Sequence, residues 1–251
     1  MGEQTCYRPV RSYVLRQGRL TAAQAQALDR HWAEYGIDYS PVPLDLHQVY
    51  GRSAPKILDI GSGMGAVTIS LALEHPENDY LAVEVHRPGV GRLIGQAHSA
   101  NIRNIRIICH DVMDVLEHQL TVRCLDEVYI FFPDPWPKKR HHKRRLIKPG
   151  FITLLATRLK THARIFIATD WRDMAAQILN ICDAEPGLTN LAGRGYYSPR
   201  PQWRPMTKFE QRGHDLDHQV WDLDYAVDIS GLNRPSKEVI AVNSALSRAG
   251  R

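Results

Sequence analysis

Acidic residues stand at the ends of three short apolar runs in the first half of the chain. Asp59 lies near the end of the first run, Glu84 near the end of the second, and Asp111 just after the third. If these runs are parallel strands, their carboxyl ends meet at one edge of a sheet, where such sheets bind ligands. Carboxylates accept hydrogen bonds and attract cations, so the three acids predict binding of a polar, partly cationic small molecule.

A glycine-rich turn follows the first of these acids. Asp59 opens the pattern Asp-x-Gly-x-Gly-x-Gly with Gly61, Gly63 and Gly65, and glycines let a ligand approach the backbone closely. Gly61, Gly63 and Ala66 also satisfy the permissive dinucleotide pattern Gly-x-Gly-x-x-Gly/Ala. The turn by itself therefore leaves two ligands open, a dinucleotide and S-adenosylmethionine.

The acids favour S-adenosylmethionine over a dinucleotide. Asp59 would repel a pyrophosphate and attract the ammonium group of a methionine. Glu84 offers two oxygens to the two hydroxyls of a ribose, and Asp111 offers an acceptor to an adenine amino group. The alternative is that all three acids are solvated strand ends without a ligand.

A rigid acidic and aromatic segment follows a fourth apolar run. Residues 131–137 read Phe-Phe-Pro-Asp-Pro-Trp-Pro, and prolines at every second position exclude a helix and favour an extended backbone. Asp134 and Trp136 are thus expected to be held just beyond the sheet, beside the predicted cofactor. A basic run starts at the next residue, Lys138, and this arrangement suits chemistry on a nucleic-acid base.

The positive charge of the chain is concentrated in that basic run. Six of the eight residues 138–145 are Lys or Arg, and without them the net charge of +5 would become −1. A compact cationic patch on a nearly neutral body suits a phosphate backbone. A solvated loop or contact with an anionic membrane are the alternatives for the run taken alone.

Composition excludes several other classes of protein. The 251 residues contain no apolar stretch near the roughly 20 residues that a membrane-spanning helix needs. The first residues have no apolar core of a signal peptide. The four cysteines lie far apart, which indicates free thiols in a reducing cytoplasm and no structural metal site. His214 and His218 stand four residues apart with Asp215 and Asp217 between them, but a fourth ligand is missing, so no metal is expected there either.

Short strands alternate with helices along the middle of the chain. Strands are expected at residues 56–60, 80–85, 105–109, 125–132 and 164–168, with helices at 66–74, 88–100, 112–118, 150–160 and 171–183. This alternation predicts one α/β domain with a mostly parallel sheet covered on both faces. Residues 219–227 predict a late antiparallel strand, and residues 21–24 predict a capping box that opens an earlier helix.

The chain resembles the bacterial tRNA (guanine-N7)-methyltransferases over residues 11–223. The segments that carry the resemblance are residues 11–13 with Arg16, Gly18, Arg19, Thr21 and Gln24, residues 84–86 with 88–91, residues 109–111, residues 131–136 with Lys138, Arg140, His141 and 143–145, and residues 204–205 with 207–214. The resemblance implies a Rossmann-like class I methyltransferase fold with seven strands. It also implies methyl transfer from S-adenosylmethionine to a guanosine in the tRNA variable loop.

The same resemblance implies roles for individual residues. The cofactor would be held by Asp59, Glu84, Asp111 and Asp134, with Gly61, Gly63 and Gly65 in the turn beside them, and Asp134 would also be catalytic. The substrate would contact Lys138, Asp170, Thr207, Lys208, Phe209 and Glu210. The tRNA would contact Arg140, His141, His142, Lys143, Arg144 and Arg145. The family pattern is broken after His214, where the chain continues Asp-Leu-Asp-His.

The chemistry of guanine N7 limits what the acids have to do. N7 carries a lone pair and no proton, so attack on a sulfonium methyl group needs no general base. Asp134 and Asp170 are expected to act by electrostatics and positioning, and Trp136 or Phe209 to stack on the extruded base. The competing hypotheses are methylation of an exocyclic amine, RNA binding without catalysis, and an NAD-dependent oxidoreductase.

The expected organisation has three parts. Residues 1–52 form a basic N-terminal arm and a helix, residues 53–229 form the methyltransferase domain, and residues 230–251 form a tail of unknown role. Monomers and homodimers share such sequence patterns, so both remain open. No membrane partner is expected.

Overall fold

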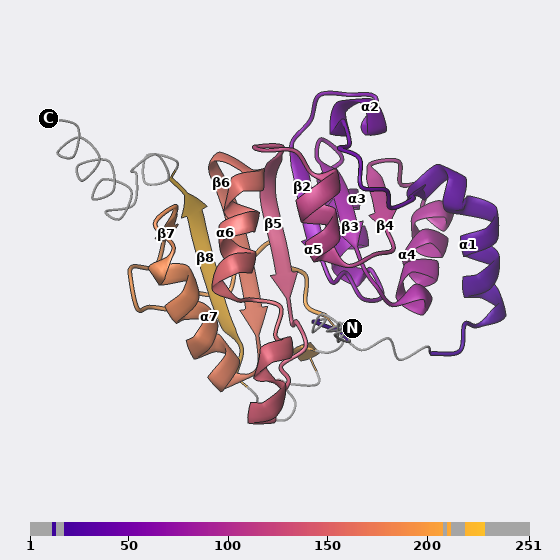
Figure 1. Ribbon diagram of the computed structural model, residues 1–251. Coiled ribbons are helices and arrows are strands. Elements are labelled where there is room, and N and C mark those ends of the chain that lie inside the picture. The colour runs from indigo at the N-terminus through magenta and orange to yellow at the C-terminus, as the bar shows by residue number, and fades with distance from the viewer. Residues whose placement is uncertain (1–11, 14–17, 208–209, 212–218, 229–251) are drawn as a thin grey trace, which may run out of the picture.

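One sheet of eight strands runs through the residues that the computed structural model describes, which are 12–13, 18–207, 210–211 and 219–228 (Figure 1). In sheet order the strands are β1 (Gly36–Ile37), β4 (Ile105–Ile108), β3 (Asp79–Val83), β2 (Lys56–Ile60), β5 (Leu125–Phe131), β6 (Leu159–Thr169), β8 (Trp221–Val227) and β7 (Leu188–Asn190). Neighbours from β1 to β6 are parallel, while β8 is antiparallel to both β6 and β7.

Helices cover both faces of this sheet. They are α1 (Ala22–Tyr35), α2 (Leu46–Tyr50), α3 (Ala66–Glu74), α4 (Arg87–Ser99), α5 (Val112–Asp114), a π-helix (Val115–Gln119), a 3₁₀-helix (Lys139–Arg144), α6 (Pro149–Arg158) and α7 (Arg172–Ala184). The α/β class, the late antiparallel strand and the predicted position of the strand at residues 56–60 are confirmed.

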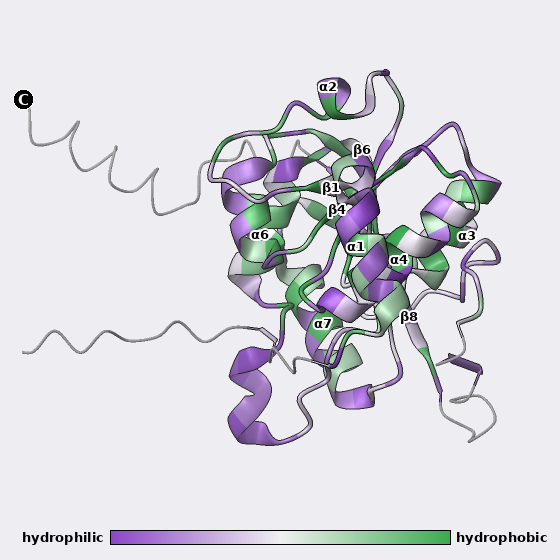
Figure 2. Ribbon diagram, turned by 90° about the vertical axis from the view of Figure 1, so that its right-hand side faces the viewer, coloured by the Kyte–Doolittle hydropathy of each residue, from purple (hydrophilic) through white to green (hydrophobic). Residues whose placement is uncertain are grey.

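Alternate residues of the central strands supply two separate hydrophobic cores. In β3, Leu81 and Val83 pack into the core that contains α6 and α7, while Tyr80 and Ala82 pack into the core that contains α3 and α4. Each fully buried Leu or Ile side chain contributes roughly 1.5–3 kcal/mol relative to an exposed one. Figure 2 shows the corresponding hydrophobic colouring on the inner sides of the helices.

The predicted capping box begins α1. Gln24 N–H donates to Thr21 Oγ1 at 3.2 Å, and Thr21 N–H donates to Gln24 Oε1 at 2.9 Å. The helix lies against α4 at the edge of the molecule (Figure 1). A Cβ at Gly91 of α4 would come within 2.7 Å of the Gln24 carbonyl oxygen, so glycine permits this close approach.

The structure differs from the expected seven-stranded sheet in one strand. The additional strand among the described residues is β1, whose two residues pair with β4 at the edge of the sheet. The helix expected at residues 112–118 is a single turn of α-helix that continues as a π-helix. The helix expected at residues 150–160 ends at Arg158, and β6 begins at Leu159 instead of residue 164.

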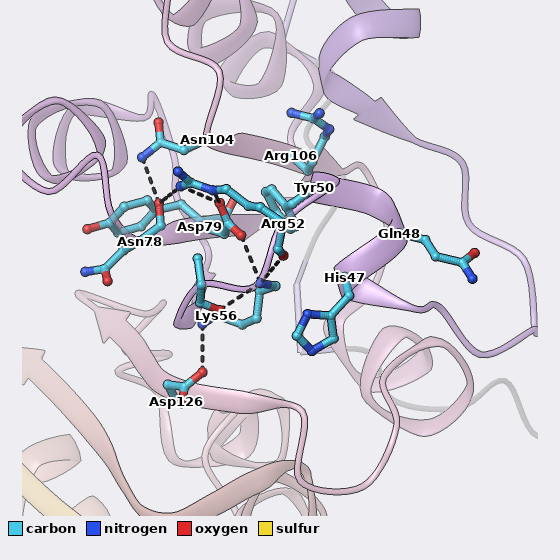
Figure 3. Close-up of polar contacts among 12 residues, drawn as sticks. His47, Gln48, Tyr50, Arg52, Lys56, Asn78, Asp79, Asn104, Arg106 and Asp126 are labelled. Atoms are coloured by element: carbon cyan, nitrogen blue, oxygen red, sulfur yellow. Dashed lines mark hydrogen bonds and ion pairs between the residues drawn. The ribbon is translucent and has the colours of Figure 1, made fainter.

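A buried ion pair ties β2 to β3 at their amino ends (Figure 3). Lys56 Nζ lies 2.9 Å from Asp79 Oδ2, and both side chains are almost fully buried. Arg52 Nε donates to Asp79 Oδ1 at 2.7 Å, and Lys56 Nζ also donates to the Ala54 carbonyl oxygen at 2.8 Å. The charges at this end of the sheet therefore have protein partners.

No helix in the described part of the chain is long and apolar enough to cross a membrane. The N-terminal residues 1–11 and the tail 230–251, for which the sequence suggested an arm and an extension, lie outside the described residues.

Candidate functional site

A cleft of about 380 Å³ opens at the carboxyl ends of the parallel strands. Three of the predicted acids line it: Glu84 after β3, Asp111 after β4 and Asp134 after β5. Gly61 of the glycine turn lines the same cleft. The fold thus brings together four predicted cofactor residues from four separate connections, as expected for parallel strands that end at one edge.

The glycine turn has a backbone that favours glycine at each predicted position. Gly61, Gly63 and Gly65 have φ angles of +73°, +57° and +79°. A Cβ at Gly61 would meet nothing within 4 Å, whereas a Cβ at Gly89 in α4 would lie 2.2 Å from the Gly63 carbonyl oxygen. The turn therefore rests on α4 and leaves open space over Gly61, which fits a cofactor that lies against the backbone.

Glu84 holds the glycine turn from the neighbouring strand. Its Oε2 accepts a hydrogen bond from Gly63 N–H at 2.8 Å, and its Oε1 accepts from Val85 N–H at 2.7 Å and His86 N–H at 2.8 Å. A carboxylate has about four acceptor positions, so room remains for hydroxyl donors. The predicted ribose acceptor is thus also the group that shapes the turn.

Asp59 lies beneath the turn and is only 4% exposed. Its Oδ2 accepts a hydrogen bond from Thr68 Oγ1 at 2.5 Å, which joins β2 to α3. The pKa of Asp59 is raised to about 6, chiefly by burial and also by the charge of Glu84, while the Thr68 hydrogen bond acts in the opposite direction. A cation bound near the turn would favour the ionised form of Asp59.

Asp111 and Asp134 keep acceptor oxygens for a ligand. Asp111 begins α5, and its Oδ1 accepts from Met113 N–H at 3.0 Å. Its second oxygen has no hydrogen-bond partner among the described residues, and the same holds for both oxygens of the exposed Asp134. These acids fit the adenine and reaction ends of the expected cofactor.

The segment 131–136, here called the Pro-Asp-Pro-Trp segment, carries backbone strain at two places. Phe132 has φ +53° and Trp136 has φ +45°, a region in which bulky side chains are rare. Each such residue costs roughly 1–3 kcal/mol and persists where its surroundings hold it. The expected extended backbone is therefore interrupted at the two residues that precede Pro133 and Pro137.

The indole of Trp136 already has neighbours on several sides. Its Nε1–H donates to the Ser12 carbonyl oxygen at 3.1 Å. The Arg144 guanidinium lies 5.2 Å from the ring centroid, and the His141 ring meets it edge-on at 5.9 Å. A guanine that stacks on Trp136 would have to use the other face or displace Arg144, so stacking there stays a prediction.

The basic run forms the 3₁₀-helix and projects beyond the carboxyl ends of β5 and β6 (Figures 1 and 2). Lys138, Lys139, Arg140 and Lys143 are exposed, as a phosphate-binding surface requires. Partial desolvation and the surrounding cations lower the pKa of His141, so its imidazole is neutral at neutral pH. The exposed Lys and Arg side chains supply the permanent positive charge of this surface.

Arg145, the last residue of the run, lies inside the protein. Its side chain is only 1% exposed, and the guanidinium binds Asp173, Gln177 and the Pro135 carbonyl oxygen. The predicted tRNA contact of Arg145 is therefore not available in this conformation.

Glu210 is buried in a similar way. It is 1% exposed and pairs with Arg204 at 2.8 and 2.9 Å and with Arg200 at 2.9 Å. These hydrogen bonds and the two cations hold the pKa of Glu210 below its usual value although burial acts against them. The predicted substrate contact would require this carboxylate to leave its partners.

None of the other predicted substrate residues within the described part of the chain lines the cleft. Lys138 is exposed, and Asp170 is half-buried directly after β6. Thr207 accepts a hydrogen bond from Glu210 N–H at 3.0 Å. Lys208, Phe209 and the departure from the family pattern at residues 215–217 lie outside the described residues.

Sequence reasoning missed several residues that line the cleft. Ser12, Tyr13, His86 and His110 do so in the structure. Their only signal was their place within segments that resemble the family, and residue type gave no role. They come together because residues 12–13 lie across the carboxyl edge of the sheet, which no local pattern indicates.

The comparison with known proteins gives one consistent family. A family model described as "Putative methyltransferase" matches residues 53–223. The tRNA (guanine-N(7)-)-methyltransferase of Nitrosospira multiformis is 55% identical over 223 residues, which are 89% of this chain and 96% of the relative. The enzyme of the same name from Nitrosomonas eutropha is 52% identical over 86% of this chain and 95% of its own length.

Solved structures of distant proteins share the fold. The 16S rRNA methyltransferase KamB has a TM-score of 0.55 at 16% identity and covers 73% of this chain and 92% of its own. The aminoglycoside resistance methyltransferase NpmB1 has a TM-score of 0.51 at 14% identity, with coverage of 73% and 92%. At such identities the similarity establishes the Rossmann-like architecture alone.

Proposed function

Because the chain belongs to the tRNA (guanine-N(7)-)-methyltransferase family, we propose that it methylates N7 of a guanosine in the tRNA variable loop, with S-adenosylmethionine as donor. The observation that carries this proposal is one cleft lined by Glu84, Asp111 and Asp134, with an exposed cationic helix beginning next to it. A small cationic cofactor and a polyanionic substrate would meet at this edge.

The cleft residues divide the cofactor between them. Glu84 accepts hydrogen bonds from the ribose hydroxyls, and Asp111 accepts one from the adenine amino group. The cofactor lies in the open space over Gly61. Asp59 acts from beneath the turn by attraction to the methionine ammonium. When bound, S-adenosylmethionine supplies an electrophilic methyl group on a sulfonium centre.

Asp134 and Asp170 serve the reaction by position and charge. The N7 lone pair attacks without losing a proton, and the purine becomes cationic as the new bond forms. A nearby carboxylate stabilises that developing charge if it is held in place beforehand. Asp134 lies at the cleft and Asp170 follows the adjacent strand β6, so both are suited to this task.

The tRNA backbone lies along the exposed cations of the 3₁₀-helix. N7 faces the deep and narrow major groove of A-form RNA, so the guanosine leaves its stack to reach the cleft. Lys138, Lys139, Arg140 and Lys143 bind phosphates on the way. Lys138, Asp170 and Thr207 are the proposed contacts of the incoming base, and Lys208 and Phe209 stay predicted contacts.

The enzyme is proposed to work in the cytoplasm, where tRNA is found. The described cleft is formed by residues of one chain, so a monomer and a homodimer would both carry it. The reaction uses no metal ion. The proposed division of the chain is an N-terminal segment (residues 1–52), a catalytic domain (53–229) and a tail (230–251).

The test uses S-adenosylmethionine with a labelled methyl group and unmodified tRNA transcripts. Borohydride reduction followed by aniline cleaves RNA at 7-methylguanosine, so the treated product reports the atom and the position together. We expect label incorporation and one cleavage site in the variable loop.

A matched transcript carries 7-deazaguanosine at the mapped position and should accept no label, because the nucleophilic nitrogen is replaced by carbon. Incorporation without cleavage would move the target to another atom, such as an exocyclic amine. Binding of tRNA without incorporation would support the hypothesis of RNA binding alone.

A further inference from the structure

Two arginines are the largest fully buried side chains in the described part of the chain. Arg145 and Arg204 are each only 1% exposed. A guanidinium stays charged in a protein, and burial of a charge is unfavourable unless partners compensate it. The two residues come from separate connections, one after the 3₁₀-helix and one before β8, yet both contact the Pro-Asp-Pro-Trp segment.

Arg145 joins the end of this segment to α7. Its Nε donates to the Pro135 carbonyl oxygen at 2.9 Å. Its two terminal nitrogens donate to Gln177 Oε1 at 2.5 Å and to Asp173 Oδ2 at 2.7 Å, and both partners belong to α7. The carbonyl next to Asp134 is thereby tied to a rigid helix.

Arg204 holds the start of the same segment. Its guanidinium carbon lies 5.5 Å from the ring centroids of both Phe131 and Phe132. The guanidinium binds both oxygens of Glu210 and lies 3.1 Å from Asp222 on β8. The two phenylalanine rings thus pack on a cation that is itself fixed to the sheet.

The positions of these contacts match the positions of the strained residues. Phe132 and Trp136 have positive φ angles, and between them lies Asp134. Arg204 contacts the first strained residue, and Arg145 binds the residue just before the second. We propose that Arg145 and Arg204 are positioning residues that hold the segment in the strained form that presents Asp134 to the cleft. This inference rests on the role proposed above for Asp134.

The basic run therefore has two tasks. The exposed cations of residues 138–143 contact the RNA backbone, whereas Arg145 shapes the reaction site from within. The distinction gives opposite kinetic signatures, because loss of a phosphate contact weakens tRNA binding and loss of positioning slows the chemical step.

The experiment compares Arg145→Lys and Arg204→Lys with Arg140→Ala. Lysine keeps the charge but has no Nε–H and no planar fork. We expect each Lys variant to lower kcat about 10–100-fold, with KM for tRNA and Kd for S-adenosylhomocysteine within about twofold of wild type. Arg140→Ala should instead raise KM for tRNA with kcat retained.

A second readout does not depend on activity. The amide of Phe132 donates to the Ala168 carbonyl oxygen at 2.8 Å, so its hydrogen exchange reports opening of the segment. Both Lys variants should speed exchange at the amides of Phe131, Phe132, Asp134 and Trp136 and leave β2 and β3 unchanged. If wild type methylates no tRNA, the proposed function fails, while the exchange measurement still decides whether the arginines hold the segment.

Wild-type kcat with wild-type exchange in a folded Lys variant would overturn the inference for that arginine. A raised KM for tRNA at unchanged kcat would return Arg145 to RNA binding. If Arg145→Lys does not fold, Asp173→Asn loosens the same contact from a side chain that is 64% exposed. That variant should lower kcat about threefold or more, and an unchanged kcat would again overturn the inference.

Discussion

Buried acids at the two ends of strands β2 and β3 have different partners. At the amino end, Asp79 is neutralised by Lys56 and Arg52 (Figure 3). At the carboxyl end, Asp59 and Glu84 form no salt bridge with any described residue and are held by a hydroxyl and by backbone N–H groups. The same two strands thus end in a closed ion cluster on one side and in unneutralised acids on the other.

The difference separates stability from function. In a buried ion pair both charges already have protein partners, and removal of one partner lowers the stability of the fold. Burial, and to a smaller extent the charge of Glu84, raise the pKa of Asp59, and groups with perturbed pKa values collect at binding sites. Four substitutions test this contrast, in decreasing order of expected effect.

Asp79→Asn should destabilise the protein most. It leaves the Lys56 ammonium buried beside a neutral amide, and breaking a buried pair costs about 3–5 kcal/mol. Urea denaturation measures the free energy of unfolding. A loss below about 1 kcal/mol would mean that this cluster behaves as a surface pair, and the contrast between the two ends would disappear.

Asp134→Asn should remove most of the activity and leave the fold intact. Loss of one preorganised electrostatic contact typically lowers kcat about 10²–10³-fold, while Tm should stay near that of wild type because Asp134 is exposed. Rates measured from pH 6 to 10 check the mechanism. Recovery of activity at high pH, or with an added base, would show that proton abstraction is required after all.

Asp59→Asn should change how stability depends on pH. The pKa of Asp59 is raised from 3.8 to about 6 in the folded chain. Protonated Asp59 therefore makes its full contribution to the free energy of unfolding below pH 4. This contribution, about 3 kcal/mol in total, is lost as the pH rises through 6. The free energy of unfolding of wild type relative to the Asn variant should fall over this range, and parallel curves would rule out the raised pKa.

Lys143→Ala should have the smallest effect. It removes one exposed cation of the 3₁₀-helix, so KM for tRNA should rise a few-fold and the salt dependence of binding should weaken by about one phosphate contact. Lys160→Ala is the matched control, because Lys160 lies at the start of β6, away from the cleft, and pairs with Asp126. If tRNA binding by the two variants had the same salt dependence, the 3₁₀-helix would not be part of the tRNA-binding surface.

The sequence predicts local features of this molecule better than the burial of its charges. Residues 56–60 and 66–74 match β2 and α3 because apolar patterning and the glycine turn act over a few residues. The six cations of residues 138–145 look alike in the sequence, yet only Arg145 is buried, since Asp173 and Gln177 come from the distant α7. Glu210 likewise belongs to a sequence motif, but its partners in the fold are Arg200 and Arg204, while Thr207 accepts a hydrogen bond from Glu210 N–H.

We expect the carboxyl ends of β2 and β3 to bind the cofactor and their amino ends to support the fold. Calorimetric titration of S-adenosylhomocysteine into wild type, Glu84→Gln and Asp79→Asn tests this expectation directly. We expect wild type and folded Asp79→Asn to bind with similar Kd, and Glu84→Gln to bind at least about tenfold more weakly. Equal losses in both variants, or no binding to wild type, would contradict this division between the two ends of the strands.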